Sequence, residues 1–293
     1  MGYETRLQPE SPPDYQPRPP EPHRICGTAP VRALFLRRPE AVQRLFYTEA
    51  MRQVAGPLCA HLARTRRPYR EVLAEELTRI AGTPHHGGIC AVAQVRYAER
   101  LPAHALPADL PAAPLLPVLD GIGNPHNLGA IARSAAFFGC RSLLLTDDPR
   151  QADLSDAAFR TAEGGLELLR VLRARELPVL LRGMRSQYLV VAAVAAGGVA
   201  PTAIPRDRPI ALVLGNEEHG PSAAVLDACE AGVTLTGGGM VESLNVASAA
   251  AVLFHALGGQ PARAAAPPPR ATPRPAPRKP PAPGGGRLRL PHR

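Results

Sequence analysis

Several features that mark other protein classes are scarce or missing in this 293-residue chain. Tryptophan is absent and aromatic residues make up only 4% of the chain, although 45% hydrophobic residues are enough for buried cores. The five cysteines are odd in number, widely spaced and form no C-x-x-C pair, which argues against a disulfide scaffold and against a structural zinc site. We therefore expect no resident metal and a reducing compartment.

Long apolar runs are also missing. No stretch approaches the roughly 20 apolar residues that span a bilayer, and the first residues lack the charged-then-apolar pattern of a signal peptide. The sequence thus predicts a cytoplasmic protein without a membrane partner.

Two nucleotide-binding fingerprints are absent as well. Gly121 and Gly123 come closest to G-x-G-x-x-G, but the third glycine is missing, and no P-loop occurs. These absences argue against an oxidoreductase of the Rossmann type, which is one rival interpretation of an α/β chain.

Proline and arginine are abundant but unevenly spread. Residues 1–24 and 261–293 are rich in proline and poor in apolar residues, so they cannot bury enough surface to offset the entropy of ordering, and we expect both to be disordered. The second segment holds eight basic residues and no acid, out of a net charge of +9. Such a tail favours salt-dependent attraction to phosphate, and a solubilising extension is an equally good interpretation.

Residues 25–100 have the pattern of a small α/β domain. Strand-like apolar residues follow Ile25, helical spacing runs through residues 39–68, a further helix is expected over residues 69–82, and a strand begins at Ile89. The adjacent His85 and His86 have no third ligand nearby, so a turn with one solvated histidine is favoured over a metal pair, and contact with RNA is the second interpretation.

The five prolines between Leu101 and Pro117 mark a linker, taken as residues 101–114. Over residues 115–260, buried strands are predicted at 115–122, 142–148, 188–196 and 210–214, with helical segments between them. Pro125 and Asn127 are expected in a turn, before a helix whose apolar face ends at Gly139. This order predicts a mainly parallel sheet with helices on both faces.

Polar residues follow the strand at residues 210–214. Asn216, Glu217, Glu218 and His219 come after its carboxyl end, where open α/β sheets place ligands. Taken alone, a solvated acidic turn is the simpler interpretation.

A second loop follows Val233, Leu235 and Thr236, for which a strand is expected. Three consecutive glycines begin at Gly237 and allow a ligand to approach the main chain. Ser243 is the expected N-cap of an alanine-rich helix from Leu244 to the residue before Gly258.

Together these stretches carry a resemblance. LGNEEHGPS followed by VESLNVASA resembles the second and third motifs of the SpoU/TrmH family of RNA ribose methyltransferases. The family's first motif, N-x-G-x-x-x-R, is matched by Asn127, Gly129 and Arg133. Three ordered motifs are far more specific than any one of them. Residues 25–100 resemble the RNA substrate-binding domain that precedes the catalytic domain in many relatives.

The resemblance implies a SPOUT domain, with a parallel sheet and a trefoil knot, that works as a homodimer. It implies that S-adenosylmethionine (AdoMet) binds among Leu214, Gly215, Leu235 and Leu244. It also implies methyl transfer to a ribose 2′-hydroxyl of tRNA or rRNA. Arg133 is then placed at the reacting hydroxyl, and hydrogen bonds from Asn127, Glu217, Ser243 and Asn245 orient the site.

One departure concerns Thr236 and Gly237, where many relatives have proline and methionine; it puts the affinity for the cofactor in question more than the activity. The alternative to an enzyme is a non-catalytic RNA-binding protein that uses the same two domains, and cofactor binding separates the two interpretations.

Overall fold

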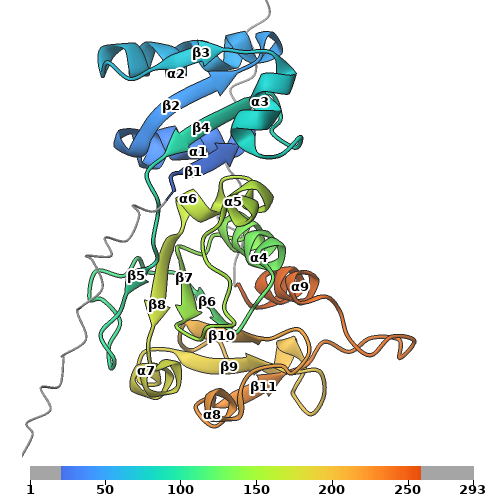
Figure 1. The fold of residues 1–293 in the computed structure, drawn as a ribbon. Helices are drawn as coiled ribbons and strands as arrows, with labels where there is room; N and C mark the ends of the chain where they lie inside the picture. The colour runs from blue at the N-terminus through green and yellow to red at the C-terminus, as the bar shows by residue number, and fades with distance from the viewer. Residues whose placement is uncertain (1–20, 259–293) are drawn as a thin grey trace, which may run out of the picture. The chain divides into compact units, whose positions relative to one another are not determined.

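The computed structural model of the chain describes residues 21–258, so the two proline-rich terminal segments lie outside the described residues except for residues 21–24. The first part of this region, up to residue 93, forms a four-stranded sheet in the order β1-β4-β2-β3 with helices packed on it (Figure 1). Its elements are β1 His23–Cys26, α1 Thr28–Arg37, β2 Val42–Tyr47, α2 Arg52–Arg64, β3 Tyr69–Glu71, α3 Ala74–Ala81 and β4 Ile89–Ala93, with short 3-10 turns at Pro39–Ala41 and Glu49–Met51.

Part of this domain differs from the expectation. Helical spacing was expected from residue 39, yet Val42–Tyr47 is strand β2, paired with both β3 and β4. The register shifts between Val42 and Arg44, as in a β-bulge, and the extra residue lets Val42 and Leu45 both enter the core. A bulge therefore produced a three-residue spacing that imitates a helix.

Other boundaries moved for local reasons. Strand β3 occupies the start of the helix expected at residues 69–82, and α3 begins only at Ala74. The residues after Cys26 form helix α1 rather than a continued strand, because Gly27 at φ 97° turns the chain and Val31 and Leu34 share one buried helical face. The strand expected at Ile89 is confirmed as β4.

The second part is an α/β domain with a seven-stranded sheet in the order β11-β9-β10-β6-β7-β8-β5, and every neighbouring pair is parallel. The predicted parallel sheet is thus confirmed. Its strands are β5 Glu99–Arg100, β6 Leu115–Asp120, β7 Ser142–Thr146, β8 Arg170–Ala174, β9 Leu189–Ala193, β10 Ile210–Gly215 and β11 Ala231–Val233. Its helices are α4 Pro125–Phe137, α5 Asp156–Ala162, α6 Gly165–Leu168, α7 Leu177–Met184, α8 Ala223–Leu226 and α9 Val246–Leu257, with a 3-10 turn at Pro201–Ala203.

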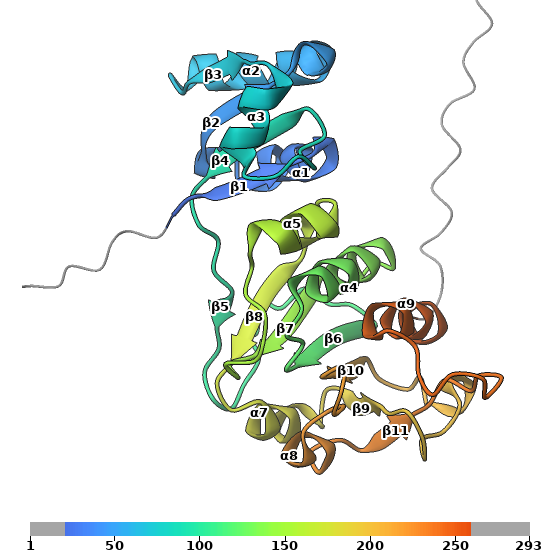
Figure 2. The ribbon, with the colours of Figure 1, turned by 45° about the vertical axis from the view of Figure 1, so that its right-hand side comes forward.

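Alternate residues of the central strands enter different cores. Leu115 and Leu119 belong to the apolar cluster that holds α4, α5 and α9, whereas Leu116 and Val118 pack with α7 and α8. Figure 2 shows these two groups of helices on opposite faces of the sheet. Because each strand is buried on both sides, it reads in the sequence as a continuous apolar run.

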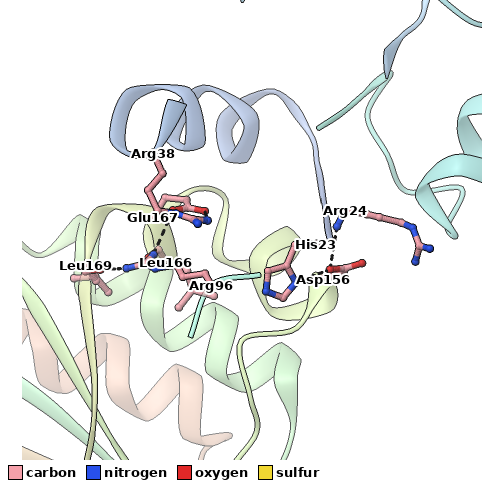
Figure 3. A network of polar contacts seen from close by, with 8 residues as sticks. All are labelled: His23, Arg24, Arg38, Arg96, Asp156, Leu166, Glu167 and Leu169. Carbon is pink, nitrogen blue, oxygen red and sulfur yellow. Dashed lines mark hydrogen bonds and ion pairs between the residues drawn. The ribbon is translucent and has the colours of Figure 1, made fainter. Parts of the chain in front are cut away.

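The two domains meet at α5 and α6. His23 Nδ1 lies 3.0 Å from Asp156 Oδ1, and the same oxygen accepts a hydrogen bond from the backbone N–H of Arg24 at 3.1 Å. Arg96 donates to the carbonyl oxygen of Leu169 at 2.8 Å. Figure 3 shows these contacts. Just beyond Arg96, β5 pairs with β8 of the second sheet, so the chain joins the second domain before the proline-rich linker begins.

Candidate functional site

The candidate site lies at the carboxyl ends of the neighbouring strands β6 and β10. Gly215 of β10 is in register with Asp120 of β6, so the loops that follow these strands begin side by side. The side chain of Asn216 donates to the carbonyl oxygen of Gly121 at 2.9 Å and joins the two loops. This is the place at which the sequence predicted a ligand site.

The loop after β10 is ordered by its own first residue. Asn216 Oδ1 accepts hydrogen bonds from the backbone N–H groups of Glu218 and His219 at 3.0 and 3.3 Å. Asn216 and Gly220 also exchange backbone hydrogen bonds. Glu218 and His219 are exposed, as a solvated turn requires, but Glu217 has a specific partner.

That partner is Asn127, in the first turn of α4. Asn127 Nδ2 donates to Glu217 Oε1 at 2.6 Å, and Asn127 Oδ1 accepts from Asn245 Nδ2 at 3.2 Å. Asn245 in turn caps α9, because its Oδ1 accepts from the N–H groups of Ala247 and Ser248 at 2.9 and 3.4 Å. One chain of hydrogen bonds therefore joins three segments, one from each of the three motifs.

Two expected positions differ from the structure. Asn127 is helical rather than in the preceding turn, since Asn124 caps α4 by accepting from the N–H of His126 at 2.8 Å. The N-cap of the last helix is Asn245 and not Ser243, and α9 begins at Val246 rather than Leu244. The expectation of Ser243 was wrong: an asparagine caps as well as a serine does, and Asn245 is the residue that also contacts Asn127.

The structure does not bring Ser243 or Arg133 into this chain. Both residues are exposed, and neither side chain makes a hydrogen bond or ion pair within residues 21–258. At 100° and 1.5 Å per residue, Arg133 lies about 120° around α4 from Asn127 and about 9 Å along its axis. Its backbone faces α6, where a Cβ on Gly165 would lie 3.0 Å from Arg133 Cα.

The four expected cofactor residues lie in two places: Leu214 and Gly215 end β10, whereas Leu235 and Leu244 lie in the loop between β11 and α9. Leu214 is 1% exposed and Gly215 is buried, Leu235 is half-buried, and Leu244 is 51% exposed.

The strand expected through Thr236 ends at Val233. Thr234 still donates its backbone N–H to Val199 O, and its hydroxyl accepts from Gly198 N and donates to Val194 O, whereas no backbone hydrogen bond of Leu235 follows within the described residues. Leu235 therefore lies in the loop beyond the strand.

The loop between β11 and α9 fits a ligand that is bound by main-chain groups. No backbone hydrogen bond involves residues 235–244 within the described part of the chain, so their N–H and C=O groups have no main-chain partner there. A Cβ added to Gly237 or Gly238 would meet nothing within 4 Å. Free amides beside apolar side chains suit the polar edge of a purine.

Sequence reasoning missed Asp120 at the end of β6. Its side chain is almost fully buried, and Oδ2 accepts from the N–H of Ser222 at 2.8 Å. It lines a polar hollow of about 220 Å³ whose walls are Asp120, Thr146, Asp147, Asp148, Arg175, Leu177, Pro178, Ser222 and Val225. The signal in the sequence was an acid that ends a wholly apolar strand.

Comparison with known proteins covers both parts of the described structure. The SpoU rRNA Methylase family matches residues 114–255, and the family described as RNA 2′-O ribose methyltransferase substrate binding matches residues 24–97. Both families match in their expected order along the chain. The chain belongs to the SpoU family.

Two curated relatives of this SpoU chain are named uncharacterized tRNA/rRNA methyltransferases. YfiF of Escherichia coli O157:H7 is 32% identical over 79% of this chain and 66% of its own length. The Haemophilus influenzae protein is 34% identical over 63% of this chain and 52% of its own length. The SpoU chain thus spans between about half and two thirds of these relatives.

Two solved structures share the fold of the SpoU chain. The SpoU methyltransferase AviRb from Streptomyces viridochromogenes, in complex with AdoMet, has a TM-score of 0.63 at 22% identity, covering 80% of this chain and 88% of that one. An AdoMet-bound rRNA methyltransferase from Sinorhizobium meliloti has a TM-score of 0.66 at 21% identity, covering 81% and 87%. These likenesses establish the fold.

Within residues 21–258 of the SpoU chain, no three His, Cys, Asp or Glu side chains gather as metal ligands. In the same region, no helix combines the length and apolar character needed to cross a bilayer.

Proposed function

We propose that this chain transfers a methyl group from AdoMet to a ribose 2′-hydroxyl of tRNA or rRNA. The observation that carries the proposal is the hydrogen-bonded chain Glu217–Asn127–Asn245, because it joins the three motif segments at the end of a parallel sheet. Five free cysteines in the described structure fit the reducing cytoplasm as the place of this reaction.

The cofactor, when bound, supplies a methyl group on a sulfonium centre that is open to displacement. Leu214, Leu235 and Leu244 would enclose its adenine and ribose, and unpaired main-chain groups of the 235–244 loop would bond the edge of the ring. Asn127 holds Glu217 on one side and Asn245 on the other, so the loop after β10 and the start of α9 keep a fixed separation. Fixed geometry of this kind provides much of the acceleration of a displacement.

Arg133 positions the substrate. A guanidinium group has five N–H donors and no acceptor, so Arg133 binds a phosphate or the reacting hydroxyl oxygen and does not remove the proton. Asn127 and Arg133 lie on different sides of α4, so we propose that Arg133 completes the site of a second copy of the chain. We also propose that the loop after β10 and the loop before α9 form a trefoil knot.

The surface around Arg133 supports a homodimer. Phe137, one helical turn further along α4, is 80% exposed, and Val252 of the neighbouring helix α9 is 46% exposed. Phe138 packs against His255 of α9 with ring centroids 5.8 Å apart, so the two helices form one surface. A second copy of the chain would cover these exposed apolar side chains beside Arg133.

Methyl transfer is the direct test. Total RNA from a strain that lacks the protein is incubated with the full chain and AdoMet labelled in its methyl group, and the nucleosides are then analysed. We expect one labelled 2′-O-methyl nucleoside, and Arg133→Ala should abolish the label while calorimetry still detects AdoMet binding. Label on a base, or equal transfer by Arg133→Ala and the parent, contradicts the assignment. If the chain binds RNA but not AdoMet, it is a non-catalytic binding protein.

Subunit mixing tests whether Arg133 acts across a dimer. Arg133→Ala has an intact cofactor site, and Leu244→Glu has an intact arginine but a blocked cofactor site. If the arginine serves the partner's site, each mixed dimer has one good site, and random exchange restores roughly a quarter of the parental rate. If Arg133 serves its own site, the mixture stays inactive, as does each variant alone.

A further inference from the structure

Two cysteines of the N-terminal sheet lie directly opposite each other. Cys26 is the last residue of β1, and the antiparallel register of β1 with β4 pairs it with Cys90. Opposite residues of an antiparallel pair point to the same face of the sheet, and both side chains pack in one apolar cluster with Leu77 and Ala81 of α3. Both are free thiols, and the proposed methyl-transfer site uses neither.

The backbone hydrogen bonds fix how closely the two residues approach. Gly27 donates its N–H to the carbonyl oxygen of Ile89 at 3.1 Å, a bond that flanks the Cys26–Cys90 pair and does not join its two members. The cysteines therefore form a non-hydrogen-bonded pair, in which the Cα atoms are about 4.5 Å apart and the side chains lie closest. Disulfides join Cα atoms about 4.4–6.8 Å apart, so the two sulfurs are within bonding reach across the strands.

The two thiols differ in acidity. The neighbouring thiol of Cys90 lowers the pKa of Cys26 by hydrogen bonding, whereas this contact and burial raise the pKa of Cys90. The thiolate is the form of cysteine that acts as a nucleophile. Cys26 is therefore the thiol that reacts first with an oxidant, and Cys90 is the second thiol that lies beside it to complete a disulfide.

A small oxidant has a short route to the pair. The two side chains are only 2% and 0% exposed, but Cys90 closely follows the turn at residues 82–88, in which His86 alone is buried. Exposed turns open locally at low cost in free energy. Hydrogen peroxide is little larger than water, so an opening of this turn is enough to admit it.

From these observations we propose that Cys26 and Cys90 are a redox modification site, which a peroxide converts into a disulfide between β1 and β4. The Cys26 thiolate attacks one peroxide oxygen, the O–O bond breaks, and the departing hydroxide takes the proton that Cys26 gave up and leaves as water. The sulfur of Cys90 then attacks the sulfenic acid at Cys26, the S–O bond breaks, and a second water leaves with the proton of Cys90. The two thiols lose two electrons, which reduce the peroxide to water. The inference is independent of the proposed function.

The disulfide would fasten the two strands that lead to the contacts with the second domain. On the β1 side, the backbone N–H of Arg24 donates to Asp156, and beyond β4 Arg96 donates to the carbonyl oxygen of Leu169 (Figure 3). The loop closed by the disulfide contains β2, β3 and all three α-helices of the N-terminal domain. Closing a long loop restricts the unfolded chain, so oxidation should stabilise this domain.

The test uses the full chain, reduced and then freed of reductant, with hydrogen peroxide as the oxidant. Thiols that remain are blocked with N-ethylmaleimide in urea, and the peptides are mapped by mass spectrometry without reduction. Cys59→Ala is the matched control, because Cys59 packs in the apolar cluster on the other face of the sheet. Cys90→Ala keeps only the thiol that is expected to react first.

We expect a Cys26–Cys90 link as the main product in the parent and in Cys59→Ala, with Cys140 and Cys229 still open to N-ethylmaleimide. The link should form at least about tenfold faster than Cys140 is oxidised, because the pKa of that thiol is about 12. The oxidised chain should melt about 5 °C or more above the reduced chain, and a dithiol reductant should reverse the shift. Cys90→Ala should give a sulfenic acid at Cys26 that dimedone labels, and no link.

The proposal is overturned if N-ethylmaleimide still blocks both Cys26 and Cys90 after peroxide treatment of the parent, or if Cys26 is joined to any cysteine other than Cys90. A link that forms as fast in urea as in the folded chain also overturns it, because the sheet would then not direct the pairing. The peptide map of the parent decides the question even if Cys90→Ala does not fold.

Discussion

Glu167 and Arg38 form a buried two-point ion pair that joins the two domains. Arg38 donates from Nε to Oε2 at 2.9 Å and from Nη2 to Oε1 at 2.7 Å, and the Glu167 side chain has no exposed surface. Arg96 Nη1 also lies 3.3 Å from Glu167 Oε2. A single carboxylate in α6 therefore balances two arginines of the N-terminal region (Figure 3).

Neutralising this carboxylate should be costly. Glu167→Gln leaves Arg38 and Arg96 in partly buried positions without a counter-charge, and breaking a buried pair in this way costs about 3–5 kcal/mol. The measurement is the free energy of unfolding from urea titration. Glu71→Gln is the matched control, because its partner Arg52 is 61% exposed and exposed pairs contribute little. Similar midpoints of urea unfolding for Glu167→Gln and Glu71→Gln would contradict a stabilising role of the buried carboxylate.

Asn245 has two tasks that substitution can separate. Asn245→Asp keeps the oxygen that caps α9 but loses the N–H that reaches Asn127, so stability should stay near the parent's while the methyl-transfer rate falls about 100-fold through misplacement. Asn245→Ala should in addition lose about 1 kcal/mol of stability with the cap.

The matched control is Asn124→Asp, which keeps the equivalent cap of α4 and should lose neither stability nor rate. The two tasks would not be separate if Asn245→Asp transferred methyl groups as fast as the parent.

The glycines of the site differ sharply in how well they tolerate substitution by alanine. A Cβ on Gly215 would lie 1.9 Å from Pro221 N and 2.1 Å from the carbonyl carbon of Gly220. Overpacking costs about 1–3 kcal/mol where neighbouring side chains can shift. Here the neighbours are backbone atoms, which cannot shift in the same way, so the cost is larger. Gly215→Ala should therefore fail to fold or melt far below the parent in calorimetry, whereas Gly238→Ala, with nothing within 4 Å, should melt with it. Equal melting temperatures would show that the turn after β10 opens.

Cys140 and Cys229 should react slowly in the folded protein. Burial raises the pKa of the Cys140 thiol to about 12 and that of Cys229 to about 11, because it disfavours the charged thiolate. At pH 8 iodoacetamide should therefore label both much more slowly than it does in urea, as followed by mass spectrometry, and the labelling rate should rise with pH. Rapid labelling of native Cys140 would show that its surroundings open.

Much of the C-terminal domain was predictable from the sequence. Its strands are buried on both faces, so they appear as uninterrupted apolar runs between turn residues, and each of β6, β7, β9 and β10 was expected near its true position. The N-terminal domain was harder, because the bulge in β2 gives Val42 and Leu45 a helical spacing. No local pattern distinguishes that spacing from a helix; only pairing with β3 and β4 does.

The sequence by itself determined the three motifs, their order and the kind of fold that holds them, because these depend on residue type and periodicity along the chain. Only the tertiary structure decided that Asn245 rather than Ser243 caps α9, that Asn127 joins Glu217 to Asn245, and that Arg133 lies apart from them. These outcomes depend on contacts between residues about 90 to 120 positions apart. Such contacts exist only after the sheet has brought its strand ends together.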